Sequence, residues 1–357
     1  MIKMNKLTVN DILRDGVYFY FHSDSVSQIS ICIGESLEDS GIPIFSNTNL
    51  YEKPYDNNTF LFNKSDISPK EASIIMIDLS FMDRTGLINV TLPDELLKNQ
   101  DKFFFICSAD MSIYVLPARS VRSSDVGIPI ISTHENKFYA PLLNPRIPWG
   151  FGIRKTALYS VQDRTTGNKK MKILRNFSST SNQDVRNSLD LFFVPHLTDT
   201  FEIDYEINYD NHFSRLSEYP LCLTYGGAYG TNVFHTKNSY FSKKSDPLGF
   251  YFKSPVVFRW DSYRTGEAMA SGCVSVHLDY DEFGFKLQYS NPKNWIDYIG
   301  ISSTHISQDI KKLKQLSIDD LHAIGERGRK WFLNRFSPSN LSGLLMDILI
   351  KPFNYYY

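Results

Sequence analysis

Short unbroken runs of apolar residues constrain this chain most, because a strand that is apolar on both faces must be covered on both faces. The first such run is residues 17–21, and further strand candidates in the first part of the chain are 42–45, 73–79, 102–107 and 125–131. A helix-length segment, residues 27–40, lies between the first two runs and is closed by Gly41. Buried strands separated by segments of crossover length are typical of a parallel sheet. We therefore expect the first part of the chain to form an α/β domain.

The same rhythm returns after a break at residues 141–168, where Pro and Gly cluster around Trp149 and Phe151. Such punctuation predicts a linker or a loop at a hinge. The next strand candidates are residues 171–174, 221–225, 256–259 and 273–278. Helices are expected at 184–193, at 317–336 and, as a final amphipathic segment, at 338–351. This pattern predicts domains at residues 1–165 and 166–337, with residues 338–357 as a closing helix.

Composition excludes several classes of protein. The chain has 357 residues, 42% hydrophobic and 22% charged, which excludes a disordered or fibrous protein. Its formal net charge of −1 gives no electrostatic basis for binding nucleic acid, so no nucleic-acid partner is expected. We find no window apolar enough for a membrane span and no signal-peptide pattern, and expect a cytoplasmic protein. The four cysteines are scattered singly, which indicates buried reduced thiols rather than a zinc clasp.

Residues 259–276, with the sequence RWDSYRTGEAMASGCVSV, form the segment with the most specific chemistry. They predict a loop, a short helix starting near Thr265, a terminating Gly272 and a strand. A cap from Ser262 or Thr265 would leave the helix N-terminus free to bind phosphate. Arg264 would add a guanidinium that is matched to a diphosphate. Glu267, one turn into the helix, is placed to accept hydrogen bonds from a ribose diol.

This segment resembles the donor-binding segment of GT-B glycosyltransferases, whose pattern is roughly E-A-[ML]-A-x-G-x-[PV]-V. The residues that carry the likeness are those of RTGEAMASGCVSV, and the likeness implies that Glu267 binds the ribose of a sugar nucleotide. A weaker likeness to exostosin-type domains lies in Arg175–Asn176–Phe177, in VRNSL at 185–189 and in residues 221–227. The resemblance implies a GT-B fold, in which two Rossmann-like domains with parallel sheets face each other across a cleft and the last helix crosses back to the N-terminal domain.

The implied function is a glycosyltransferase that moves a sugar from a nucleotide-diphosphate sugar to a hydroxyl acceptor, such as a glycan, lipid, protein or small molecule. Arg259 stands where family-4 members carry the first Glu of E-x7-E, and Val274 stands in place of the usual Pro. Donor sugar, nucleotide base, acceptor, stereochemistry and oligomeric state therefore stay open. The alternatives are a non-catalytic GT-B scaffold that binds a glycan or partner, and a sugar-nucleotide epimerase.

Other candidate residues extend the site. GT-B enzymes generally work without a catalytic metal, so no metal or other cofactor is expected. A nucleotide-diphosphate donor requires positive charge beside its phosphates, and a glycine turn can wrap the nucleotide. The full predicted donor set is Arg154, Lys155, Arg175, Tyr225, Gly226, Arg259, Ser262, Tyr263, Arg264, Thr265, Gly266 and Glu267. The loop that begins at Tyr225 is expected to wrap the nucleotide, with an aromatic ring stacked on the base.

An inverting transfer would need a general base, and histidines or carboxylates that follow strands are the candidates. His22 and Asp24 follow the first predicted strand, and His134 follows the strand at 125–131. The sequence contains no HExxH, no GxxxxGK[ST], no G-x-S-x-G and no convincing DxD motif, so metalloprotease, P-loop, hydrolase and metal-dependent transferase chemistry lack support.

Overall fold

The computed structural model describes residues 7–56, 58–80, 92–107, 128–137, 146–162, 171–178, 184–207, 212–229, 257–258 and 260–355. The chain divides into two compact units, which we call unit 1 and unit 2. Unit 1 comprises Met1–Glu135, Ala140–Thr156 and Phe336–Tyr357, and unit 2 comprises Asn136–Tyr139 and Ala157–Arg335. Each unit contains its own parallel sheet.

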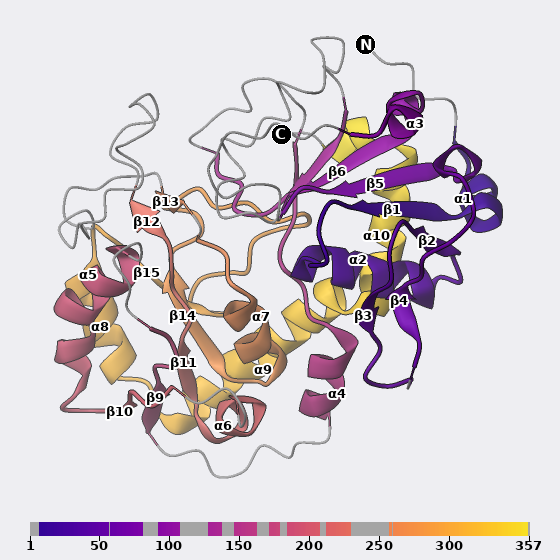
Figure 1. Ribbon diagram of the computed structural model, residues 1–357. Coiled ribbons are helices and arrows are strands. Elements are labelled where there is room, and N and C mark those ends of the chain that lie inside the picture. Colours follow the sequence, from indigo (N-terminus) through magenta and orange to yellow (C-terminus); the bar gives the residue numbers. More distant parts are fainter. Residues whose placement is uncertain are drawn as a thin grey trace. The chain divides into compact units, whose positions relative to one another are not determined.

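Unit 1 is built on a six-stranded parallel sheet in the order β2-β1-β5-β6-β7-β8 (Figure 1). Its strands are β1 (Val17–Phe21), β2 (Ile44–Ser46), β5 (Ile74–Asp78), β6 (Phe103–Cys107), β7 (Ile130–Ser132) and β8 (Arg146–Pro148). A small antiparallel pair is formed by β3 (Leu50–Glu52) and β4 (Phe60–Phe62), and the helices are α1 (Val9–Asp15), α2 (Gln28–Asp39), α3 (Asp94–Leu97) and α10 (Pro338–Ile350).

The apolar runs form strands because both faces of this sheet are buried. Successive residues of β1 point to opposite faces, so Phe19 joins one hydrophobic cluster and Tyr18 joins the other. Met76 and Ile75 of β5 divide between the two clusters in the same way. A strand with both faces covered has no position for an alternating polar residue, which confirms the prediction of a parallel sheet from the unbroken runs.

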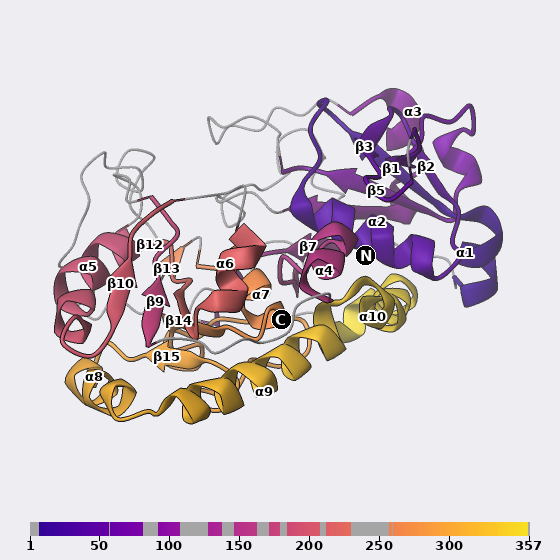
Figure 2. The ribbon, with the colours of Figure 1, turned by 90° about the horizontal axis from the view of Figure 1, so that it is seen from below.

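The last helix belongs to unit 1, as the resemblance to the GT-B fold implied. Figures 1 and 2 show α10 beside α2, and the two helices are in contact. Leu341, Leu345 and Ile348 of α10 are fully buried in the same cluster as Phe19 of β1. The end of the chain therefore completes the hydrophobic core that its beginning starts.

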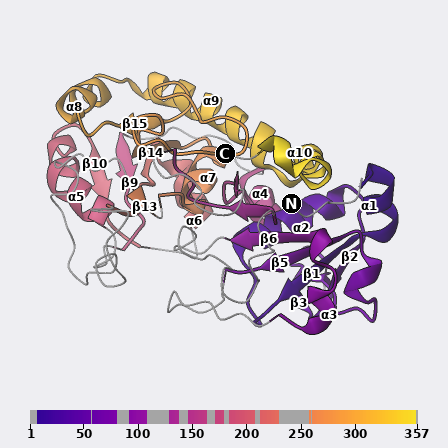
Figure 3. The same ribbon diagram turned by 90° about the horizontal axis from the view of Figure 1, so that it is seen from above.

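Unit 2 contains a five-stranded parallel sheet in the order β10-β9-β11-β14-β15. Its strands are β9 (Lys172–Leu174), β10 (Glu202–Asp204), β11 (Leu221–Leu223), β14 (Val274–Leu278) and β15 (Ile299–Ile301). The helices are α5 (Asp184–Phe192), α6 (His212–Glu218), α7 (Tyr263–Ala270), α8 (Ile306–Lys314) and α9 (Ile318–Phe336), and α4 (Lys155–Gln162) begins in unit 1 and continues into unit 2. In Figures 2 and 3, α9 runs along one side of the sheet and α6 lies on the other.

Three sequence expectations need correction. The segment at 256–259 does not extend the parallel sheet, because β13 (Val257–Phe258) pairs antiparallel with β12 (Ala228–Tyr229). The Pro-rich break at 141–168 is more than a linker: it contributes β8 at the edge of the first sheet and the helix α4. An edge strand tolerates Pro148 because one side of its backbone makes no ladder hydrogen bonds. The short strands β10 and β15 also have no counterpart among the predicted runs.

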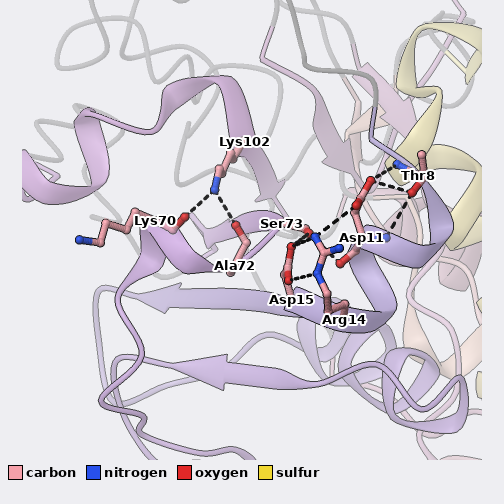
Figure 4. A network of polar contacts seen from close by, with 8 residues as sticks. All are labelled: Thr8, Asp11, Arg14, Asp15, Lys70, Ala72, Ser73 and Lys102. Atoms are coloured by element: carbon pink, nitrogen blue, oxygen red, sulfur yellow. Dashed lines mark hydrogen bonds and ion pairs between the residues drawn. The ribbon is translucent and has the colours of Figure 1, made fainter.

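A polar network on unit 1 fixes the start of the fold (Figure 4). Thr8 caps α1 in a capping box with Asp11, whose side chain accepts a 3.0 Å hydrogen bond from the Thr8 backbone N–H. Ser73, just before β5, donates to the backbone carbonyl of Asp11 at 2.9 Å. Arg14 pairs with Asp15 at 2.7 Å on the same helix. These contacts join α1 to the central strand β5, and they give the charges of Asp11, Arg14 and Asp15 partners within the fold.

Candidate donor site in unit 2

The candidate site lies at one edge of the second sheet. The carboxyl ends of β9 and β11 meet there, and each is followed by residues that the sequence analysis singled out, Arg175 and Tyr225. The helices that connect parallel strands run back antiparallel to them, so α5, α6 and α7 all begin at this same edge. Ligands of open α/β sheets bind at such an edge.

The helix α7 begins where its capping residue places it. Ser262 has an extended backbone, and its hydroxyl accepts a 3.3 Å hydrogen bond from the Arg264 N–H. The carbonyl of Ser262 accepts from the Thr265 N–H at 3.0 Å. The helix therefore starts at Tyr263, two residues before the expected start, with Ser262 rather than Thr265 as its cap. Tyr263 is exposed, and Thr265 and Gly266 are buried in the first turn.

Two guanidinium groups pack on one aromatic ring at this edge. Phe177 is fully buried, and the guanidinium carbons of Arg175 and Arg186 lie 4.4 Å and 4.7 Å from its ring centroid. Arg175 is held by Asp190, with one hydrogen bond of 2.9 Å from Nε and a second from Nη2. Burial lowers the pKa of Arg175, but the bonds to Asp190 outweigh burial and raise it above its ordinary value. Its charge is thus already balanced within the protein.

Arg186 and Arg264 differ from Arg175 within the part of the chain that the structure describes. Among the residues that the structure describes, neither arginine forms an ion pair with a carboxylate. Arg186 donates to the backbone carbonyls of Tyr225 and Ser178 at 3.3 Å and 3.1 Å. Burial, together with the charge of Arg264, lowers the pKa of Arg186 to about 10. The charge of Arg264 is close enough to lower the pKa of Arg186, and an anion would be stabilised beside two such cations.

Glu267 is tied into a chain of hydrogen bonds. Its Oε2 lies 2.9 Å from Nε2 of His212, the first residue of α6. The other ring nitrogen of His212, Nδ1, lies 2.9 Å from the side-chain amide nitrogen of Asn176. The backbone carbonyl of Asn176 accepts a 3.0 Å hydrogen bond from Nε of Arg264. The predicted phosphate residue and the predicted ribose residue are therefore joined through Asn176 and His212.

Tyr225 corrects one expectation. Its ring is fully buried and packs edge-on against Phe177 with centroids 5.4 Å apart, so it presents no face to a base. Gly226 and Gly227 follow it, and the φ of 105° at Gly227 is a conformation that favours glycine. Gly226 stays a predicted contact through its backbone. Arg259 lies outside the described residues.

The predicted bases lie in unit 1 and differ in accessibility. His22 and Asp24 follow β1 directly and are exposed. His134 follows β7 as expected, but its side chain is only 2% exposed and packs edge-on against Phe151 at 5.5 Å. A base must reach the acceptor hydroxyl, so the catalytic role predicted for His134 would require its ring to become exposed.

Lys155 and Arg154 also lie in unit 1. Lys155 is buried, and its Nζ pairs with Glu38 at 2.8 Å and with Asp39 at 2.6 Å. Two carboxylates pair with this lysine, and its role as a phosphate ligand stays a prediction. Arg154 is half-buried. Burial raises the pKa of the nearby Glu35 carboxyl, and the charge of Arg154 partly opposes that rise.

Metal sites and membrane-spanning helices are both absent from the ranges that the structure describes. Within them, no three His, Cys, Asp or Glu side chains are grouped as a metal site. Nor does any helix in those ranges have the length and apolarity needed to cross a membrane.

Solved structures resemble this chain in fold over nearly its whole length. An alpha-glucosyltransferase in complex with UDP and a 13-mer DNA containing a central A:G mismatch is similar with a TM-score of 0.50 and 10% identity, covering 93% of this chain and 98% of that one. The fold is GT-B. Sucrose-phosphate synthase from Thermosynechococcus elongatus has a TM-score of 0.45 at 10% identity, covering 95% of this chain and 99% of that one. A glycosyltransferase involved in avilamycin A biosynthesis has a TM-score of 0.43 at 10% identity, covering 94% and 98% of the two chains. No protein-family model matches the sequence, and no curated protein matches it.

Three residues of the candidate site are absent from the set that the sequence predicted. Arg186 belongs to the exostosin-like VRNSL segment, so a signal for it existed in the sequence. Asn176 belongs to the exostosin-like segment Arg175–Asn176–Phe177, so a signal of the same kind existed for it. His212 is 55 positions from Glu267, and no local pattern connects the two. Only the packing of α6 against α7 brings them together.

Proposed function

We propose that the protein transfers a sugar from a nucleoside diphosphate sugar to a hydroxyl acceptor. The observation that carries this proposal is the pair Arg186 and Arg264, which have no ion-pair partner among the described residues and adjoin the helix that bears Glu267. The GT-B fold is consistent with it. The similar alpha-glucosyltransferase was solved with UDP, and a nucleoside diphosphate is the ligand that we assign to this edge.

The two arginines would stabilise the charge that develops on the leaving diphosphate. When the glycosidic bond to the donor phosphate breaks, negative charge accumulates on the phosphate oxygens. Arg186 and Arg264 are held by hydrogen bonds to backbone carbonyls before the donor arrives, so they need little rearrangement during the reaction. The N-terminus of α7 adds its free N–H groups and positive dipole end. With this charge supplied by the protein, the proposed transfer requires no metal.

Glu267 would bind the ribose. An ionised carboxylate only accepts hydrogen bonds, and one carboxylate oxygen has the lone pairs to accept from both hydroxyls of a ribose diol. Glu267 lies one turn further into α7 than Arg264, so one short helix would contact both parts of the nucleotide.

We further propose that the acceptor is uncharged and binds unit 1. The segments of unit 1 contain 15 Lys and Arg against 19 Asp and Glu, a balance that repels a polyanion such as DNA. The exposed His22 and Asp24 are the candidates for a base there. Incorporation of labelled sugar into DNA would contradict this choice of acceptor.

The test is donor binding by Glu267→Ala. A thermal-shift panel of ADP, GDP, CDP and UDP first identifies the preferred base, because a ligand at 100 times its Kd adds about 2.7 kcal/mol of stability. The loss of two hydrogen bonds to ribose should then weaken the binding of that nucleotide by about 1–3 kcal/mol, roughly 5- to 150-fold, measured by calorimetry. Lys330→Met, at an exposed residue of α9, is the control for an unspecific loss of charge and should bind normally.

Three results would overturn the proposal. Unchanged nucleotide affinity in Glu267→Ala would remove the assigned ribose contact. Absence of any stabilisation by the four nucleotides would favour a non-catalytic scaffold that binds a glycan or partner. Release of an epimerised sugar nucleotide without acceptor would instead identify an epimerase.

A further inference from the structure

The imidazole of His212 lies between two polar side chains that determine where its proton resides. The amide nitrogen of Asn176 has only hydrogens to offer, so Nδ1 of His212, 2.9 Å away, must accept. A neutral imidazole that accepts at Nδ1 carries its hydrogen on Nε2. That hydrogen points at Oε2 of Glu267, again over 2.9 Å. The ring is therefore a neutral donor to the carboxylate, with its tautomer set by Asn176.

This donor occupies one oxygen of Glu267 and leaves the other available. Within the described part of the chain, Oε1 of Glu267 accepts no hydrogen bond. The Glu267 and His212 side chains are each 12% exposed, so the pair lies at the margin of the protein interior rather than in free solvent. A long side chain that is held in one rotamer loses less entropy when a ligand binds. The hydrogen bond thus presents Oε1 in a fixed direction.

The three residues of the relay come from three different elements. Asn176 follows β9, His212 begins α6 and Glu267 lies in α7. Arg264, also in α7, joins these three residues because its Nε donates a 3.0 Å hydrogen bond to the backbone carbonyl of Asn176. Supporting hydrogen bonds of this kind fix the geometry of binding groups more tightly than the rotamers of the binding groups alone.

We propose that His212 is a positioning residue that orients the Glu267 carboxylate toward the ribose hydroxyls of the nucleotide. This inference rests on the proposed function, since it assumes that a nucleoside diphosphate binds at Arg264 and Glu267. It predicts that the ribose hydroxyls contribute to affinity only while a donor at the Nε2 position holds Glu267.

Two substitutions separate the two ring nitrogens. The amide nitrogen of Gln lies about as far along its side chain as Nε2, so His212→Gln keeps a donor to Glu267. The amide of Asn reaches only the position of Nδ1, so His212→Asn keeps the neighbour Asn176 and loses Glu267. The measurement is the ratio of Kd values for the preferred ribonucleoside diphosphate and for its 2′,3′-dideoxy form, determined by calorimetry.

Wild type and His212→Gln should prefer the ribonucleotide, whereas His212→Asn should lose about tenfold of that preference. His212→Asn and wild type should bind the dideoxy form equally, because only the contact with the ribose diol changes. A loss caused by general destabilisation would weaken the binding of both nucleotides alike, so the ratio distinguishes positioning from folding. If His212→Asn does not fold, His212→Phe keeps a ring without either nitrogen and replaces it.

An unchanged preference in His212→Asn, with wild type still preferring the ribonucleotide, would overturn the role of His212 and leave the proposed function intact. A wild-type protein that binds no nucleoside diphosphate would overturn both. A wild type that binds both forms equally would reject the ribose contact and, with it, the positioning role.

Discussion

At the scale of single residues, Glu35 is a carboxyl group in surroundings that disfavour its charge. It lies in α2 with 0% exposure, and its Oε2 accepts a 2.7 Å hydrogen bond from the backbone N–H of Lys155. Burial raises its pKa to about 7, and the Lys155 bond only partly opposes that effect. At physiological pH the carboxyl is therefore close to its midpoint.

Stability should consequently depend on pH through this group. Because the pKa of Glu35 is higher in the folded than in the unfolded state, its contribution is complete below pH 4.5 and is lost as pH rises through 7. We expect Glu35→Gln to raise the free energy of unfolding at pH 8 by at most about 3 kcal/mol relative to wild type, and so to raise Tm. At pH 5 the substitution should change Tm little. Thermal melts at the two pH values measure this. Glu52→Gln, at an exposed residue, is the control, and an equal Tm difference at both pH values would refute the argument.

Between elements, the approach of α9 to the end of α7 depends on one glycine. A Cβ on Gly325 would lie 2.2 Å from the backbone carbonyl oxygen of Gly272, too close for any real contact. Gly272 in turn has a φ of 67° and terminates α7, the helix that bears Glu267. Close packing at Gly325 thus holds α9 against the segment that positions the donor residues.

A methyl group at this contact should force the two elements apart. We expect Gly325→Ala to destabilise unit 2 by about 1–3 kcal/mol, measured as a lower Tm, despite the better helix propensity of Ala. Gly343 in α10 has nothing within 4 Å of its Cβ position, so Gly343→Ala is the matched control and should stabilise by up to about 1 kcal/mol. Equal effects of the two substitutions would show that the contact at Gly325 is not limiting.

At the level of the whole molecule, unit 1 is assembled from the two ends of the chain. Residues of α10 fill the cluster that β1 and α2 begin, although more than 300 positions separate Phe19 from Leu345. We expect Leu345→Ala to cost about 2–5 kcal/mol through loss of buried area and a residual cavity. Amide hydrogen exchange should then accelerate in β1 and α2, at the other end of the sequence. Asp347→Ala, at an exposed neighbour, should leave exchange unchanged, and faster exchange confined to α10 would contradict the shared core.

The sequence indicated the fold class because its signals are local and strong. Tyr18 and Phe19 are both apolar, so a strand there must be buried on both faces, and the structure places them in opposite clusters. Ser262 and Gly272 mark the two ends of α7 by side-chain capping and by a positive φ, both of which depend on residue type alone. The position of Glu267 within that helix followed from the same local signals.

Side-chain partners could not be predicted in this way. An aromatic residue after a strand packs into a core or lines a site with the same local pattern, and only the neighbours of Tyr225 decide that its ring is buried against Phe177. Lys155 has the charge of a phosphate ligand, but Glu38 and Asp39 reach it from α2. The β8 strand lies in a Pro-rich segment whose composition predicts a loop.

The sequence by itself therefore determined the α/β class, the capped helix α7 and the position of Glu267 one turn into that helix. Each of these depends on residues that are close together in the chain. Only the tertiary structure decided which arginines lack a carboxylate partner among the described residues and which histidine adjoins Glu267. Those properties arise when α5, α6 and α7 begin at one sheet edge and bring distant side chains within hydrogen-bond range. Ion pairing and tautomer choice are properties of neighbours in space, and the order of residues in a chain does not state them.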